Sequence, residues 1–235
     1  AREKVEIPRA TQSGWLMQMY ESIKILQPVL RQAVLENGIV FTDDTPVALQ
    51  DHQNNPGKFK KARLWVYVRG GTGPPLSVYD FSMDRGKRRP LEFLTDYRGY
   101  VHADAYSGYD ELFKKDGVLE VGCWAHARRK FDEASSSRPQ EATDILARIA
   151  RLYREVETPG KELQVAELYQ LRQQKARPML DNIFVALEEL KGKTIPAEPI
   201  RKAIDYALNQ KEALYRYLEN GYLKPDNNTA ENAMR

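Results

Sequence analysis

The sequence is poor in cysteine, since Cys123 is the single cysteine among 235 residues. One cysteine excludes a disulfide within the chain and a metal site built from several cysteines. This usage favours a reducing, cytoplasmic setting. Long apolar runs are also missing. No stretch approaches the roughly 18 residues that would predict a membrane span, and the first residues lack the pattern of a signal peptide.

The chain also lacks a strong excess of charge of either sign. Lys and Arg number 36 and Asp and Glu number 33, for a formal net charge of +3. This balance permits nucleic acid binding without requiring it, because one basic face suffices and acidic metal ligands offset part of the positive charge. Apolar residues make up 42% and charged residues 29%, as in soluble globular domains. The chain begins at Ala1, not Met, and stops within a helix-like segment, so we expect a fragment of a longer protein.

The N-terminal part predicts one helix and then strands. Apolar residues at three- and four-residue spacing indicate a helix over 11–37, with a kink at Pro28. Short β-prone runs follow at 39–42, 63–69 and 76–81. The first run is predicted to end in an acidic, turn-forming cluster at its C-terminal side, and the polar residues before the second run are predicted to form a loop over 51–61.

The middle of the chain alternates between helical and strand patterns. We predict a short helix over 89–97, a strand over 100–103, a helix over 106–114 and a strand over 118–123, with helices from about 125 on. Three strands, helix, strand, helix, strand, helix is the order of an RNase H-like α/β fold. That fold has a mixed five-stranded sheet with flanking helices.

The helical patterns after the fifth strand exceed what such a sheet needs. We interpret 133–222 as an all-helical insertion before the last core helix. The core is then 39–132 plus 223–235, and 1–38 is an N-terminal helical segment. The pattern does not indicate the purpose of the insertion.

Three acidic residues stand where a metal site could form. Asp43 follows the first strand, Asp104 follows the fourth, and Glu231 lies near the start of the last helix. Carboxylates at the ends of neighbouring strands meet at one sheet edge, and hard cations such as Mg²⁺ and Mn²⁺ prefer oxygen ligands. Two such ions, about 3.5–4 Å apart, support in-line displacement at phosphorus. Taken alone, each residue is better explained as a turn residue or helix cap.

Four segments together resemble the transposases of the insertion sequence 66 family. They include Phe-Thr-Asp-Asp-Thr-Pro-Val at 41–47 with the strand at 63–67, Ala-Asp-Ala-Tyr-Ser-Gly-Tyr at 103–109, Cys-Trp-Ala-His-Ala-Arg-Arg-Lys-Phe at 123–131, and Asp-Asn-Asn-Thr-Ala-Glu at 226–231. They occur in the family's order and cover most of the chain from about 39 to the end.

The resemblance implies a DDE-type catalytic domain with an RNase H-like fold. The acidic residues of the family's motifs match Asp43, Asp104 and Glu231, which are then the catalytic residues and the ligands of a two-metal Mg²⁺ or Mn²⁺ site. Asp44 stands where the family often has Glu. Because side chains alternate along a strand, only one of the two adjacent Asp residues should face the metal, and we favour Asp43. Asn232 stands where the family usually has Arg.

The basic segment after Cys123 has two interpretations. His126, Arg128, Arg129 and Lys130 lie beside the active site and contact DNA phosphates, with His126 also able to order a water or the scissile phosphate. Alternatively, they form the solvated face of a helix. A zinc site of Cys123 and His126 is not expected, because structural zinc takes four ligands.

Two asparagines and two further basic clusters complete the candidates. Asn227 and Asn228 are predicted to cap the last helix. Alternatively, they position Glu231 or DNA, and Asn228 is a candidate DNA contact. The basic residues at 85–89 and 58–63 are interpreted first as solvated loops, and as DNA tracks if they share a face with the carboxylates.

The resemblance implies a transposase that cuts at an element's ends and joins the freed 3′-hydroxyl to target DNA. Its partners would be transposon ends, target DNA and further copies of itself, with neither a membrane nor a small-molecule substrate, and it would act at the nucleoid in the cytoplasm. Two alternatives remain open. One is another metal-dependent nuclease of the same fold, and the other is an inactive, transposase-derived DNA-binding or assembly module.

Overall fold

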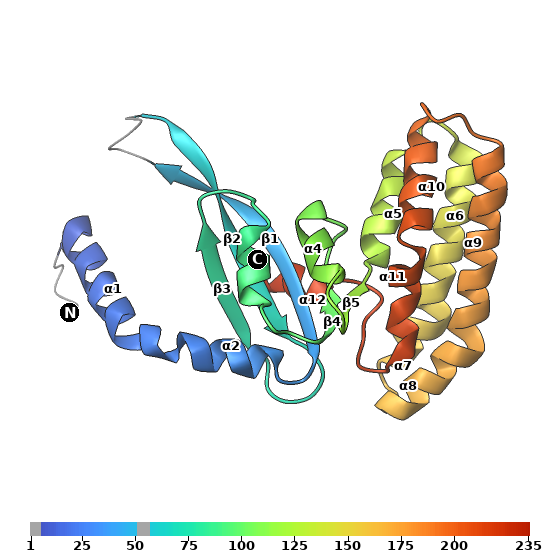
Figure 1. The fold of residues 1–235 in the computed structure, drawn as a ribbon. Coiled ribbons are helices and arrows are strands. Elements are labelled where there is room, and N and C mark those ends of the chain that lie inside the picture. The colour runs from blue at the N-terminus through green and yellow to red at the C-terminus, as the bar shows by residue number, and fades with distance from the viewer. Residues whose placement is uncertain (1–5, 51–56) are drawn as a thin grey trace.

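The fold centres on a mixed five-stranded sheet in strand order β3-β2-β1-β4-β5 (Figure 1). A computed structural model describes residues 6–50 and 57–235. The strands are β1 (Ile39–Gln50), β2 (Phe59–Arg69), β3 (Ser77–Ser82), β4 (Gly99–His102) and β5 (Val118–Val121). The first three pair antiparallel, whereas β4 pairs parallel with both β1 and β5. The predicted RNase H-like α/β fold, with helices around a mixed sheet, is confirmed.

Strand β1 is longer than its sequence predicts. It runs through the acidic cluster to Gln50, which pairs with Phe59 of β2. The predicted turn at 43–46 is therefore wrong, as is the predicted loop over 59–61, while 51–56 lies outside the described residues. Pairing with β4 stops at Phe41. Beyond that point one side of β1 is a sheet edge, where a proline such as Pro46 is tolerated.

Alternating side chains of the central strands build two separate cores. One core contains Phe41 and Val66 and continues into the helices after β5. The other contains Val40, Trp65 and Val101 and is covered by helices from the N-terminal half. Since the alternation continues past the buried part of β1, neighbouring residues of the acidic cluster point to opposite faces.

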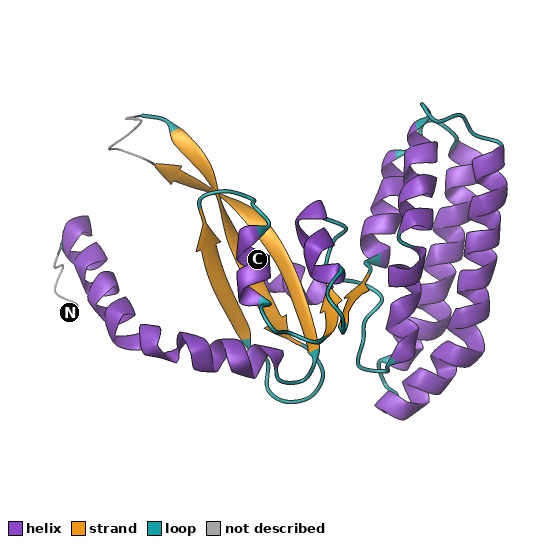
Figure 2. Ribbon diagram, in the orientation of Figure 1, coloured by secondary structure: helices purple, strands orange, loops and turns teal. Residues whose placement is uncertain are grey.

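The helices divide between these two faces and one end of the sheet (Figure 2). The second core is covered by α2 (Gln27–Leu35), α3 (Arg88–Phe93) and α4 (Asp110–Phe113), the last preceded by a 3-10 turn at Ser107–Tyr109. On the first face lie α5 (Trp124–Glu133) and the last helix, α12 (Asn228–Ala233). The predicted helices over 89–97 and 106–114 are thus confirmed in shorter form.

A helical bundle stands beside the sheet, beyond β5 (Figure 1). Together with α5 it contains α6 (Pro139–Leu152), α7 (Thr158–Gly160), α8 (Val165–Leu171), α9 (Arg177–Gly192), α10 (Pro199–Asn209) and α11 (Lys211–Arg216). Its apolar stripes are buried in the same cluster as Phe41 and Val66. Gly122 permits a close approach, since a Cβ there would lie 3.1 Å from the backbone nitrogen of Leu214. We keep the division into a core and an insertion over 133–222 as a proposal.

The N-terminal helix is only partly packed. It comprises α1 (Arg9–Ile23), a 3-10 turn over Lys24–Leu26, and α2, with Pro28 in the first turn of α2. The predicted break thus falls just before the proline. Trp15 is 54% exposed and Val34 is fully buried, so only the C-terminal part of the predicted apolar stripe reaches the core. Among the described residues, no helix is long and apolar enough to cross a membrane.

Candidate active site

The parallel register of β1 and β4 brings Asp43 and Asp104 to the same end of the two strands. The last residue pair of this ladder is Phe41 with His102. Asp43 and Asp104 follow two residues later, at corresponding positions of the two chains. They therefore lie just past the end of the ladder, where β1 continues along β2 and the chain after β4 turns away.

The two adjacent aspartates of β1 have different surroundings. The Asp44 side chain is 2% exposed and forms ion pairs of 2.8 Å with both Arg63 and Arg85. Asp43 accepts the Asp44 backbone N–H at 2.8 Å. Burial raises the pKa of Asp43 and, together with the negative charges of Asp104, Asp44 and Glu231, brings it to about 6 against the opposing effect of the Asp44 backbone N–H. The charge of Asp44 is thus balanced by two arginines on one face of the sheet. Asp43 points to the opposite face, where α12 lies.

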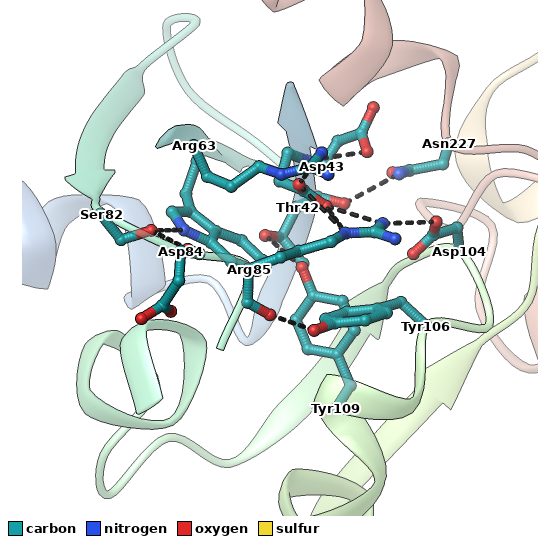
Figure 3. A network of polar contacts seen from close by, with 12 residues as sticks. Thr42, Asp43, Arg63, Ser82, Asp84, Arg85, Asp104, Tyr106, Tyr109 and Asn227 are labelled. Carbon is teal, nitrogen blue, oxygen red and sulfur yellow. Dashed lines mark hydrogen bonds and ion pairs between the residues drawn. The ribbon is translucent and has the colours of Figure 1, made fainter. Parts of the chain in front are cut away.

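Arg85 joins two of these carboxylates (Figure 3). Its guanidinium lies 2.8 Å from Asp44 and 3.6 Å from Asp104. It is held 4.0 Å above the ring of Tyr106, whose hydroxyl donates to the Arg85 carbonyl. The interpretation of 85–89 as a solvated loop is therefore wrong for Arg85, although the Lys87 side chain is 58% exposed, as expected. The sequence did not predict that Tyr106 would hold Arg85 between Asp44 and Asp104.

A polar chain fixes α12 against β1. Asn227 is buried and donates from its side-chain amide to the Thr42 carbonyl at 2.9 Å, and the Thr42 hydroxyl lies 3.1 Å from the Tyr109 hydroxyl (Figure 3). The predicted capping by the Asn227 side chain is wrong. The carboxylate of Asp226 instead accepts the backbone N–H of Asn228 at 3.1 Å. The asparagine before α12 thus anchors the helix that carries the third carboxylate.

Glu231, in the first turn of α12, lies against α5. Its Oε1 is 3.9 Å from His126 Nδ1 and 3.9 Å from the Arg129 guanidinium. Both His126 Nδ1 and Glu231 Oε1 are buried without a hydrogen-bond partner in the described part of the chain. Burial lowers the pKa of His126, against the opposing effect of Asp104 and Glu231. The imidazole and the glutamate are therefore close, but too far apart for a direct hydrogen bond.

The predicted triad is gathered but not compact. Asp43 is close enough to Asp104 and Glu231 for both charges to raise its pKa, and burial also raises the pKa of Asp104. Carboxylates in these surroundings fit a hard divalent cation, since a cation would relieve both the desolvation and the mutual repulsion. Within residues 6–50 and 57–235, a tighter group comprises Cys123, His126 and Glu231, whose ligand atoms lie within 4.8 Å of one another.

The candidate DNA contacts separate into three places. His126 and Arg129 are at Glu231. Arg128 is exposed and lines a hollow together with Asn228. Lys130 lies 4.5 Å above the ring of Tyr206 in α10 and so faces the bundle. Two of the five candidates, His126 and Arg129, therefore lie at Glu231. Arg128 and Asn228 line a separate hollow, and Lys130 contacts Tyr206, which lies next to Ala105 and feels the charge of Asp104.

Comparison with known proteins agrees with these motifs. An uncharacterised protein of Sinorhizobium fredii, y4qI, is 35% identical over the whole chain, which covers 45% of that protein. Another from the same organism, y4jD, is 26% identical over 98% of the chain and 47% of its own length. The chain therefore spans less than half the length of these relatives. The family described as "Transposase IS66 family" matches residues 1–235, and the chain belongs to that family.

Proposed function

We propose that this chain is the catalytic domain of a DDE transposase, which cleaves DNA at the ends of an insertion sequence and joins the freed strand to target DNA. The observation that supports this proposal is that Asp43 and Asp104 each follow the last β1–β4 residue pair by two residues. The charges of Asp104 and of Glu231 in α12 both act on Asp43. Family membership supports the transposase role.

In this proposal Asp43, Asp104 and Glu231 hold two Mg²⁺ or Mn²⁺ ions. When bound, such ions activate the attacking hydroxyl and stabilise the leaving oxygen of an in-line displacement. Neighbouring side chains would position these carboxylates and balance the charge beside them. Arg85 and Tyr106 position Asp104 and keep Asp44 neutralised.

Both reactions would use the same site. In cleavage, the water oxygen forms a bond to phosphorus, the bond to the 3′-oxygen breaks, and that oxygen leaves as a 3′-hydroxyl. In strand transfer, the 3′-hydroxyl oxygen attacks a target phosphodiester and the target's own 3′-oxygen leaves. The charge and bond changes at phosphorus are alike in the two steps, so one set of carboxylates suffices.

DNA would lie across the α5 side of the carboxylates. In this proposal Arg129, with a 54% exposed side chain, and Arg128, which lines a hollow with Asn228, would contact backbone phosphates. We further propose that the protein acts as a homo-oligomer on paired ends at the nucleoid, which rests on family membership alone.

The test is cleavage and strand transfer by the full-length protein on DNA carrying the element's ends, with Mg²⁺ or Mn²⁺. We expect Asp43→Asn, Asp104→Asn and Glu231→Gln each to lower both rates by at least about 100-fold, equivalent to about 2.7 kcal/mol. A matched control is Asp116→Asn, because the Asp116 side chain is 98% exposed and pairs with the exposed Arg98.

Each alternative predicts a different result. Cleavage without transfer of a pre-cut 3′-end would identify a nuclease of the same fold. A wild-type protein that binds the ends and never cuts them would identify an assembly module. Full activity in the three carboxylate variants would refute the site.

A further inference from the structure

Two helix starts bring three different metal-binding groups to one point. Cys123 precedes the first residue of α5, His126 is in the first turn of that helix, and Glu231 is in the first turn of α12. The sulfur, an imidazole nitrogen and a carboxylate oxygen lie within 4.8 Å of one another. This group does not include Asp43 or Asp104.

Two atoms of this group lack a partner. His126 Nδ1 and Glu231 Oε1 are buried, and neither has a hydrogen-bond partner in the described part of the chain. Buried polar atoms are nearly always paired, so two orphans facing each other need an explanation. Their separation of 3.9 Å is too long for a hydrogen bond. Two ligands of one tetrahedral ion, each about 2.0–2.2 Å from it, lie about 3.4 Å apart, so a movement of about half an ångström lets both atoms bind one ion.

The sulfur is placed to act as a thiolate ligand. Cys123 Sγ accepts the backbone N–H of Asn227 at 3.3 Å, and the backbone amides of Ala125 and His126 also favour its charged form. Burial nevertheless raises the pKa of the free thiol to about 11. A cation that binds here therefore displaces the thiol proton to solvent, and the amides at the start of α5 stabilise the resulting thiolate.

We propose that Cys123, His126 and Glu231 form a binding site for a thiophilic divalent cation of the Zn²⁺ class. Sulfur and imidazole ligands select such ions over Mg²⁺, which prefers six oxygens. Three protein ligands leave a fourth tetrahedral position open, as in zinc sites that are not purely structural. Considering Cys123 and His126 alone gave too few ligands, and Glu231 supplies the third from the far end of the chain.

The site has a consequence for the reaction, which rests on the proposed function. Glu231 cannot serve both sites in the same way at once. A cation held by Cys123 and His126 draws Glu231 toward α5 and away from Asp43 and Asp104. Zn²⁺ would then inhibit cleavage that Mg²⁺ or Mn²⁺ supports.

The binding test uses Co²⁺ as a spectroscopic substitute for Zn²⁺, on the untagged chain. We expect a thiolate-to-cobalt charge-transfer band in the near ultraviolet and visible bands typical of four-coordinate Co²⁺, all abolished by one equivalent of Zn²⁺. Cys123 is the only cysteine, so any such band reports on this site.

Substitutions make the assignment specific. Cys123→Ser should remove the charge-transfer band, and His126→Gln should weaken Co²⁺ binding at least about 10-fold while keeping the band at saturating Co²⁺. Using both guards against one variant failing to fold, which circular dichroism checks. The matched control is Asp116→Asn, which should bind Co²⁺ like the wild type because Asp116 is exposed and belongs to neither metal site.

The outcomes separate the two proposals. If the wild type shows no thiolate band, or if neither substitution changes Co²⁺ affinity, the site is refuted whatever the enzyme does. If Co²⁺ binds as expected but the full-length protein cleaves no DNA, the proposed function fails and the site stands. If cleavage occurs, micromolar Zn²⁺ should inhibit the Mg²⁺-supported rate.

Discussion

At the scale of single residues, the site contrasts two neighbouring aspartates on one strand. Asp44 is buried with two arginines, whereas Asp43 carries a raised pKa among other carboxylates. Alternation along β1 made this division predictable. The arginines that pair with Asp44 were not predictable, because Arg63 and Arg85 are 19 and 41 residues away from it in the sequence. Contacts of that range depend on the sheet pairing, which a sequence pattern does not specify.

The raised pKa of Asp43 predicts a cost in stability without metal. The folded protein holds the Asp43 proton more tightly than the unfolded chain does, since the pKa rises from 3.8 to about 6. Stability therefore falls as the pH rises from about 4 to about 6 and stays lower above that range. We expect Asp43→Asn to raise the free energy of unfolding at pH 7.5 by about 1–2 kcal/mol, after allowing for partial exposure, with little change at pH 4.

Urea unfolding of metal-free protein at the two pH values measures this effect. Asp116→Asn is the control, because its exposed carboxylate should give no difference between the two pH values. A lower stability of Asp43→Asn at pH 7.5 would show that the ionised carboxylate is not under strain. Such a result would remove one reason for placing a cation there.

At the scale of elements, the helices and strands were mostly predictable and their limits were not. Periodicity identified β4, β5 and the bundle helices, because each buries one face or stripe. It misplaced the end of β1, since Asp and Pro are rare in strands. Eleven residue pairs with β2 outweigh that preference at 43–46. The sequence also did not predict where α12 packs, because its contact with β1 depends on the buried side chain of Asn227.

That contact predicts a specific role for Asn227 in holding α12. Asn227→Ala removes the bond to the Thr42 carbonyl and leaves a buried acceptor unpaired, which we expect to cost about 1–3 kcal/mol. Amide hydrogen exchange should show faster exchange in α12 than in the bundle helices. Asn228→Ala is the control, because Asn228 is exposed and should change stability by no more than about 0.5 kcal/mol. Equal effects of the two substitutions would contradict the anchoring role.

At the scale of the whole molecule, the chain leaves the sheet after β5, passes through the helical bundle and returns to the sheet at α12. Arg172, at the junction of α8 and α9, is buried and binds both carboxylate oxygens of Glu157, at 3.1 and 2.7 Å. The same guanidinium donates to the Leu223 carbonyl at 2.8 Å. Leu223 lies in the segment that joins the bundle to α12. One buried arginine therefore ties the inside of the bundle to the segment that positions Glu231.

The contacts of Arg172 with Glu157 and with Leu223 predict two separable effects. Arg172→Met leaves Glu157 buried without its partner, which should cost about 3–5 kcal/mol. Adding Glu157→Gln removes the unpaired charge and should restore much of that stability. The bond to Leu223 stays broken in the double variant, so the segment before α12 should remain loosened. We therefore expect the double variant to unfold at nearly wild-type urea concentrations and still to bind Co²⁺ more weakly.

Arg148→Ala is the control, because its pair with Asp144 lies on the bundle surface and should contribute less than about 0.5 kcal/mol. If the double variant recovered both stability and Co²⁺ affinity, the bundle would stabilise the chain without positioning Glu231.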